Sequence, residues 1–174
     1  MSIIDLLLKS DEPSLKFKTK VFLLNENPES SENKKLQSDI KNSPRVKKLL
    51  SNRNASGELE PVNDPYQKWF GAHWVLVHLA ELCYPQNDKA LFPLRDQIYD
   101  LWLSDYMFKT VNYGNKMPTQ KGEGVPVING KARRCVSQQG NALFSTLSLG
   151  IADERSENLL ELILKWQWPD GGWN

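Results

Sequence analysis

The chain has 174 residues, of which 40% are hydrophobic and 25% are charged, a composition typical of an ordinary folded domain. Its net charge is only +1 and its basic residues are dispersed, which argues against a nucleic-acid-binding protein. No apolar run approaches the roughly 20 residues that span a bilayer, and the first residues are too short and too acidic for a signal peptide. We therefore expect a cytoplasmic protein without a membrane span.

Residues 1–53 predict an N-terminal region of short helices in series. The first predicted helix spans Ser2 to Lys9. The other three begin at Asp11 and Pro13, near Ser31, and at Ser43-Pro44. The last of these starts with a capping Ser followed by Pro at the first helical position. Such helices resemble HEAT-like repeats, in which each helix pair buries its apolar face against the next pair.

Residues 54–65 contain Gly57, Pro61 and an Asn-Asp-Pro turn signal, so they are expected to form a connector. The following segment, from Gln67 to Cys83, is apolar nearly all round, which is typical of a helix surrounded by other helices. Residues 88–104 instead carry a single apolar stripe opposite charged residues. The pattern predicts an inner helix followed by an outer helix.

The same alternation appears again after residues 109–131, whose glycines and prolines predict a long loop or lid. Residues 137–149 are rich in small side chains and end at Gly150, and residues 154–168 carry one apolar stripe. Alignment of Leu82 with Leu149 and of Cys83 with Gly150 gives a repeat interval of 67 residues. Residues 66–174 are therefore predicted to contain two inner/outer helix pairs.

The most specific pattern is the block QWPDGGW, which spans residues 167–173. Its two glycines, Gly171 and Gly172, permit positive φ and a sharp reversal after the preceding helix. The Gln167 amide can stack on Trp173 and satisfy backbone groups at the helix ends, and Asp170 can cap a following helix. These roles are structural, so we weigh this block as a turn motif in preference to a catalytic one.

This block resembles the QW repeat of squalene and oxidosqualene cyclases. The segments HWVLVHLAEL and SQQGNALFSTLSLG are also similar to inner helices of prokaryotic prenyltransferase-like and squalene cyclase-like proteins. The resemblance implies an all-α fold, with helical hairpins of an incomplete α/α toroid preceded by the short HEAT-like helices. We accordingly expect no β-sheet larger than a hairpin in residues 66–174, and a multi-stranded sheet there would contradict a toroid.

Five residues of the predicted inner helices are candidates for lining a pocket: Trp69, His73, Trp74, Gln138 and Asn141. Aromatic faces can stabilise a carbocation in an isoprenoid cavity, whereas the same residues at helical spacing are also typical of ordinary core. The pair Arg133 and Arg134 could contact a diphosphate, and solvated charges at a loop end are the alternative.

The sequence lacks the residues that the related enzymes use for catalysis. It has no Asp-rich D-x-D-D acid motif for protonating an alkene. His73 and His78 are five residues apart, which does not bring them to one helix face, and Cys83 and Cys135 are isolated and expected to be buried free thiols. We expect no metal site, no cofactor and no catalytic residue among these groups.

Two functions follow as hypotheses. In the first, the chain is the N-terminal part of a prenyltransferase-like or squalene cyclase-like toroid whose substrate is unassigned, and any enzymatic activity belongs to a longer protein. In the second, it is a non-catalytic helical-repeat module that binds a protein partner. The expected partners are an isoprenoid or other apolar ligand and a second copy of the chain, bound through a C-terminal flank that two helix pairs leave open.

Overall fold

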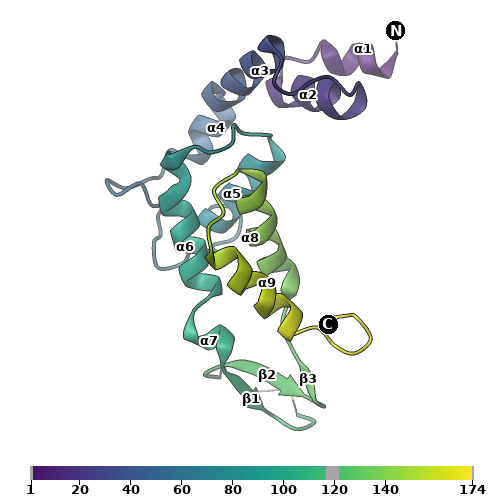
Figure 1. Cartoon of the computed structure of the whole chain (residues 1–174). Helices are drawn as coiled ribbons and strands as arrows, with labels where there is room; N and C mark the ends of the chain where they lie inside the picture. Colours follow the sequence, from purple (N-terminus) through teal and green to yellow (C-terminus); the bar gives the residue numbers. More distant parts are fainter. Residues whose placement is uncertain (1, 117–121, 174) are drawn as a thin grey trace.

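The structure is a computed structural model that describes residues 2–116 and 122–173, and it is mostly helical (Figure 1). The helices are α1 (Ile3–Leu8), α2 (Pro13–Lys18), the π-helix η1 (Thr19–Leu23), α3 (Ser31–Asn42), α4 (Pro44–Leu49), α5 (Ala72–Glu81), the 3₁₀ turn η2 (Lys89–Leu91), α6 (Phe92–Trp102), α7 (Asp105–Phe108), α8 (Val136–Ser148) and α9 (Arg155–Lys165). Within the described residues, no helix is long and apolar enough to cross a membrane. Helices α1–α4 lie at one end, the larger helices in the middle, and a small sheet at the other end (Figure 1).

The N-terminal helices confirm the predicted starts. Ser2 and Asp5 form a capping box at α1, because the Ser2 hydroxyl accepts from the Asp5 N–H while the Asp5 carboxylate accepts from the Ser2 N–H. The Ser43 hydroxyl accepts from the Val46 N–H at α4, immediately before Pro44. Helix α2 begins at Pro13 after Glu12, which makes no side-chain cap, and it runs on directly into η1.

The middle of the molecule is built from two helical hairpins, α5–α6 and α8–α9, which pack together mainly through α5 and α8. Helix α5 buries Leu76 and Leu79 completely, and α8 buries the small side chains of Ala142, Ser145 and Thr146. Small residues allow two helix axes to approach closely. Residues 66–174 therefore contain two helical hairpins that pack against each other.

The two hairpins repeat in detail at the ends of α5 and α8. Cys83 and Gly150, which the sequence alignment pairs, both adopt left-handed φ, at 56° and 63°. After α5 the Tyr84 N–H donates to the Leu79 carbonyl, and after α8 the Ile151 N–H donates to the Thr146 carbonyl, each at 3.0 Å. These are matching Schellman ends with a buried apolar residue at the same position. The repeat interval of 67 residues thus has a structural counterpart.

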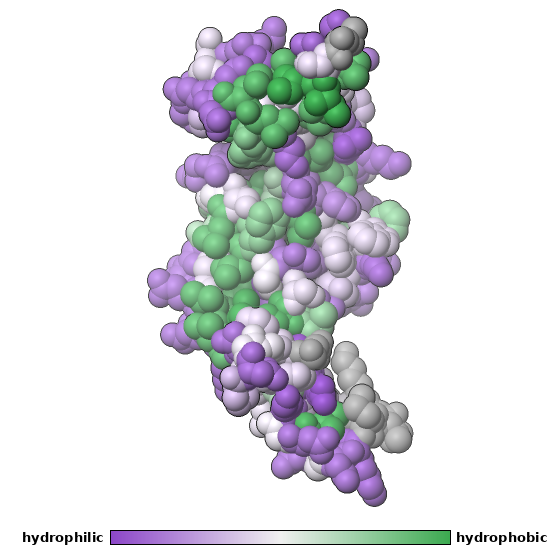
Figure 2. Space-filling model, turned by 90° about the vertical axis from the view of Figure 1, so that its right-hand side faces the viewer, coloured by the Kyte–Doolittle hydropathy of each residue, from purple (hydrophilic) through white to green (hydrophobic). Residues whose placement is uncertain are grey.

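The burial of two helices differs from the sequence prediction. Helix α6, predicted to bury one stripe, also buries Gln97 and Tyr99. The connector folds over Gln97, whose amide bonds both backbone groups of Leu59 at 2.9 Å, and the Tyr99 hydroxyl bonds Thr146 of α8 and Ser156 of α9. Helix α8, predicted to be surrounded, leaves Phe144 and Leu147 exposed. Figure 2 views the molecule from the side on which α8 lies and shows a band of apolar surface along it.

A three-stranded mixed sheet contradicts the expectation that residues 66–174 contain nothing larger than a hairpin. Its strands are β1 (Thr110–Asn112), β2 (Val125–Ile128) and β3 (Lys131–Ala132), with β1 parallel and β3 antiparallel to β2. They lie between α7 and α8, and all but the last residue of β3, Ala132, fall in the segment 109–131 that is predicted as a loop or lid. The glycines and prolines of this segment favour turns. The β-branched residues of Thr110–Asn112 and Val125–Ile128, however, favour strands, and these two runs pair.

Helix α5 starts five residues later than predicted, because residues 65–71 form a tight turn. The Gly71 N–H donates to the Gln67 carbonyl at 2.8 Å and the His73 N–H to the Pro65 carbonyl at 3.0 Å. A Cβ on Gly71 would lie 2.4 Å from the Pro65 oxygen, so no larger residue fits without moving the backbone. Within this turn Trp69 adopts a φ of 73°, a strained conformation for a bulky residue.

We predict that Gly71→Ala lowers the free energy of unfolding by roughly 1–3 kcal/mol, because the methyl group forces the turn open. Gly140→Ala is the matched control: its Cβ would meet no atom within 4 Å, and it lies inside α8. Alanine in a helix interior is worth roughly 0.5–1 kcal/mol over glycine, so this variant should be stabilised. Chemical denaturation of both variants measures the difference, and equal effects would contradict the turn's role.

Candidate functional site

An aromatic cluster surrounds the start of α5. The Tyr66 ring lies 5.1 Å from His73, 5.7 Å from Trp74 and 5.5 Å from Trp102, measured between ring centroids. Trp69 extends the cluster outward, 4.9 Å from Trp74. The rings meet at tilted or edge-on angles, the arrangement that aromatic quadrupoles favour. Four of the five come from the turn and α5, and Trp102 comes from the end of α6.

His73 is enclosed at the centre of this cluster. It is fully buried, and its Nδ1 accepts a hydrogen bond from Trp102 Nε1 at 3.1 Å. Burial lowers the pKa of His73 from its ordinary 6.5 to about 4, because the charged imidazolium would lose its hydration. His73 is therefore neutral at physiological pH, with its proton on Nε2, which finds no partner among the described residues. A ring held in this way orients Trp102 and is out of reach of a substrate.

The five pocket-lining candidates do not line a common cavity. His73 is enclosed, while Trp69 is 52% exposed, so the two cannot face the same open space. Trp74 is half-buried on α5, and Gln138 and Asn141 are half-buried on α8. The structure brings Trp69, His73 and Trp74 together as neighbours in the aromatic cluster, which corresponds to the ordinary-core alternative for His73 and Trp74.

Trp69 instead lines a surface groove that the sequence analysis missed. The groove has a volume of about 370 Å³ and lies between α4 and the 65–71 turn. Phe70 stands beside Trp69 at its edge, and Arg45 and Lys48 of α4 contribute the cationic wall. No local sequence motif predicts this site, because the residues of its two walls are about 20 positions apart in the sequence. The only signal was the Trp-Phe-Gly sequence, where two aromatics precede a glycine that starts a helix.

The arginine pair does not form one anion site, because the two side chains diverge. Arg133 lies 5.1 Å over the Trp168 ring, and Arg134 lies 5.3 Å over the Trp102 ring. The Gln139 amide is oriented so that its nitrogen donates to the Cys135 carbonyl. Its oxygen accepts from Arg134 Nε at 2.8 Å and Nη2 at 2.9 Å. Partial burial lowers the pKa of Arg134. Arg134 is thus held inward by an amide and an aromatic ring.

The Gln167–Trp173 block forms a compact turn after α9. The Gln167 amide donates to the Gly171 carbonyl at 2.9 Å, and Asp170 accepts from the Gly172 N–H at 3.0 Å. Gly171 has the expected positive φ of 85°, whereas Gly172 does not. Trp173 is half-buried and its Nε1 donates back to the Ile163 carbonyl of α9 at 2.8 Å.

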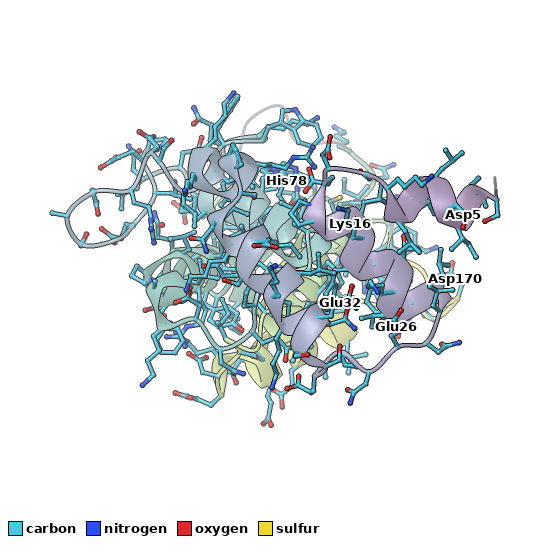
Figure 3. The ribbon with its side chains drawn as sticks, turned by 90° about the horizontal axis from the view of Figure 1, so that it is seen from above. Asp5, Lys16, Glu26, Glu32, His78 and Asp170 are labelled. Carbon is cyan, nitrogen blue, oxygen red and sulfur yellow. The ribbon has the colours of Figure 1, made fainter. Side chains whose placement is uncertain are left out.

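These contacts hold the block as a turn against α9. In the view from above, Asp170 lies well apart from His78 of α5 (Figure 3). In the same view Lys16 marks α2, Glu32 marks α3 and Glu26 marks the loop between η1 and α3. Across residues 2–116 and 122–173, no three His, Cys, Asp or Glu side chains gather in a way that could hold a metal ion. Both cysteines are free; Cys83 is half-buried and Cys135 is exposed, which corrects the expectation that both are buried.

Comparison with known proteins does not assign the chain to a family, because no family model, no curated protein and no solved structure matches it. Its function has to be inferred from its own geometry.

We predict that His73 makes the protein sensitive to mild acid. Since its pKa is lower in the folded than in the unfolded chain, protons bind the unfolded chain preferentially, and stability falls as the pH drops from about 6.5 to 4. The shift corresponds to roughly 3 kcal/mol at pH 4. His73→Gln keeps an acceptor for Trp102 and should flatten this fall, while His78→Gln should retain it. Denaturation curves at several pH values test this, and parallel curves for all three proteins would contradict it.

Proposed function

We propose that the chain is a non-catalytic helical-repeat module whose α8–α9 face binds a further amphipathic helical hairpin. The observation that carries this proposal is the exposure of two large apolar residues on each of the adjacent helices α8 and α9. They are Phe144, Leu147, Leu160 and Leu164, which are 42%, 56%, 45% and 55% exposed. Exposed apolar residues gathered on one face are typical of an interaction surface, whereas scattered ones are ordinary.

The repeat indicates what kind of occupant fits this face. Hairpin α5–α6 already packs on one side of α8–α9, and the apolar band lies on a side that it leaves open. Another hairpin with an apolar stripe could bury this band by the same helix-on-helix packing.

Charges along α9 favour an antiparallel neighbour. Glu157 is exposed in the first turn of α9, Glu161 is exposed near its middle, and Lys165 is exposed at its end. Basic residues are favoured in the last turn of a helix and acidic residues in the first turn. An antiparallel helix would place its basic end beside Glu157 and its acidic start beside Lys165.

The chain itself can test this proposal, because a second copy supplies the same apolar face. We expect concentration-dependent association in light scattering or, at low concentration, a monomer that binds an apolar dye. Leu147→Lys should weaken association at least about tenfold, since it places a charge in the apolar contact. Leu6→Lys is the matched control, because Leu6 is equally exposed, at 56%, but lies on α1.

Two outcomes would overturn the assignment of this face. One is a monomer that binds no apolar dye at any concentration. The other is association that Leu6→Lys and Leu147→Lys weaken equally, because the contact would then not be specific to α8.

A toroid of the cyclase and prenyltransferase kind, acting on an isoprenoid, is the second candidate function. The matching Schellman ends and the compact Gln167–Trp173 turn favour it, since both belong to stacked inner/outer hairpins. The three-stranded sheet counts against it, and the relation holds only if the sheet is an insertion between the hairpins. Titration with farnesol should then shift the NMR signals of Trp74 and Asn141. Unchanged signals would remove this candidate.

A further inference from the structure

The groove between α4 and the 65–71 turn has two exposed aromatic residues at its edge. Phe70 is 69% exposed and Trp69 is 52% exposed, although large aromatic side chains are normally mostly buried. The floor is apolar and closed, because Leu59 and Val75 are each 2% exposed. Together these residues form an apolar slot that is open to solvent.

The aromatic residues are held at the groove by backbone constraint. Trp69 occupies left-handed φ, which costs on the order of 1–3 kcal/mol for such a residue and persists only where surrounding structure enforces it. Gly71 provides that constraint, since its contact with Pro65 leaves no room for a Cβ. Trp69 also lies 4.9 Å from Trp74 and is stacked parallel to His78 at 6.4 Å. The aromatic wall is thus already in place before any ligand binds.

The opposite wall is cationic. Arg45 and Lys48 line the groove, and none of the lining residues is acidic. Arg45 is 3.4 Å from Glu12, a loose and exposed ion pair, whereas Lys48 makes no ion pair with any described residue. Lys68 adds a third cation above the outer edge, 5.2 Å from the Trp69 ring. The field in the groove therefore favours a negatively charged group close to an apolar surface.

We propose that this groove binds a small amphipathic anion: a flat or short apolar body that carries one carboxylate, sulfonate or phosphate group. The body lies against Trp69 and Phe70 over the apolar floor, and the anionic group meets Lys48 and Arg45. A volume of about 370 Å³ is within the range of small-ligand sites. The site is separate from the α8–α9 face and does not depend on the function proposed for that face.

Residue-resolved NMR tests this site without interference from apolar binding elsewhere. The probes are naphthalene-1-sulfonate and its uncharged analogue 1-naphthalenemethanol, each titrated into the intact chain. We expect the sulfonate to shift the Trp69 indole and the backbone amides of Phe70 and Lys48. We expect weaker binding of the alcohol at the same residues, because it lacks the charge that Lys48 and Arg45 recognise. Shifts confined to Phe144 and Leu147 would overturn the proposal.

Paired charge reversals on α4 separate the groove from a general electrostatic effect. Lys48→Glu should weaken the sulfonate about tenfold or more and leave the alcohol nearly unchanged. Lys47→Glu makes the same change of net charge on the same helix, but Lys47 lies in a separate hollow with Lys41 and Asp88, so both affinities should change by less than about twofold. Equal losses in the two variants would overturn the site.

A further variant tests the aromatic wall. Phe70→Ala removes an exposed side chain and should leave the thermal midpoint unchanged, yet it should weaken both probes because both use the apolar wall. Full binding of both probes by this variant would contradict the proposed position of the apolar body.

Discussion

Close packing of α5 against α8 places both hairpins, and it depends on small side chains whose polar atoms are satisfied within α8. Ser145 and Thr146 are completely buried at this contact, and their hydroxyls donate to the Ala142 carbonyl at 3.1 and 2.9 Å. The buried Tyr99 hydroxyl then bonds Thr146 and Ser156, which joins α6, α8 and α9. Because no buried hydroxyl here requires a partner from α5, that helix can present Leu76 and Leu79 and pack through apolar contacts alone.

Hydrogen bonds and ring contacts within the fold also explain how the polar side chains of His73 and Arg134 are accommodated against the aromatic rings. Trp102 donates to His73 and lies under Arg134, whose guanidinium is held by Gln139. Each contact uses a different part of these side chains. Arg134 lies over the face of the Trp102 ring, the Trp102 indole N–H bonds His73, and the guanidinium N–H groups bond Gln139. A neutral His73 is essential to this arrangement, since a protonated ring could not accept from Trp102. The cluster therefore joins α5 and α6 to the residues that lead into α8.

The sequence predicted what is encoded locally and missed what is assembled from distant residues. Caps at Ser2 and Ser43 fix helix starts through contacts three residues away, so those starts were found. The Cys83 and Gly150 alignment found the repeat because left-handed helix ends constrain only a few neighbouring residues. By contrast, the periodicity of α8 identifies an apolar helix but does not say which face a neighbour covers, so the exposure of Phe144 and Leu147 was not foreseen.

Long-range placement also explains the errors at the candidate site. The short strands between α7 and α8 depend on pairing β1 with β2 across the chain, which turn residues alone do not reveal. His73 and Trp74 were candidates for a pocket as well as for ordinary core, because aromatic residues on a helix fit either environment. Only the position of Tyr66 and Trp102 shows that the neighbouring space is already filled. The groove at Trp69 could not be found from either wall alone, since its charge comes from α4.

Helix α5 connects the two surfaces proposed here as binding sites. Val75 contributes to the floor of the groove, and Leu76 and Leu79, on the same rigid helix, are completely buried in the core that α8 shares. Packed interiors yield little to small forces, so a ligand in the groove would not move α8 by deforming α5. The preformed turn at Gly71 has the same consequence, because binding requires no rearrangement that could be passed on. We therefore expect the two proposed surfaces to keep a fixed relative position and to bind independently, as in a scaffold and unlike an allosteric switch.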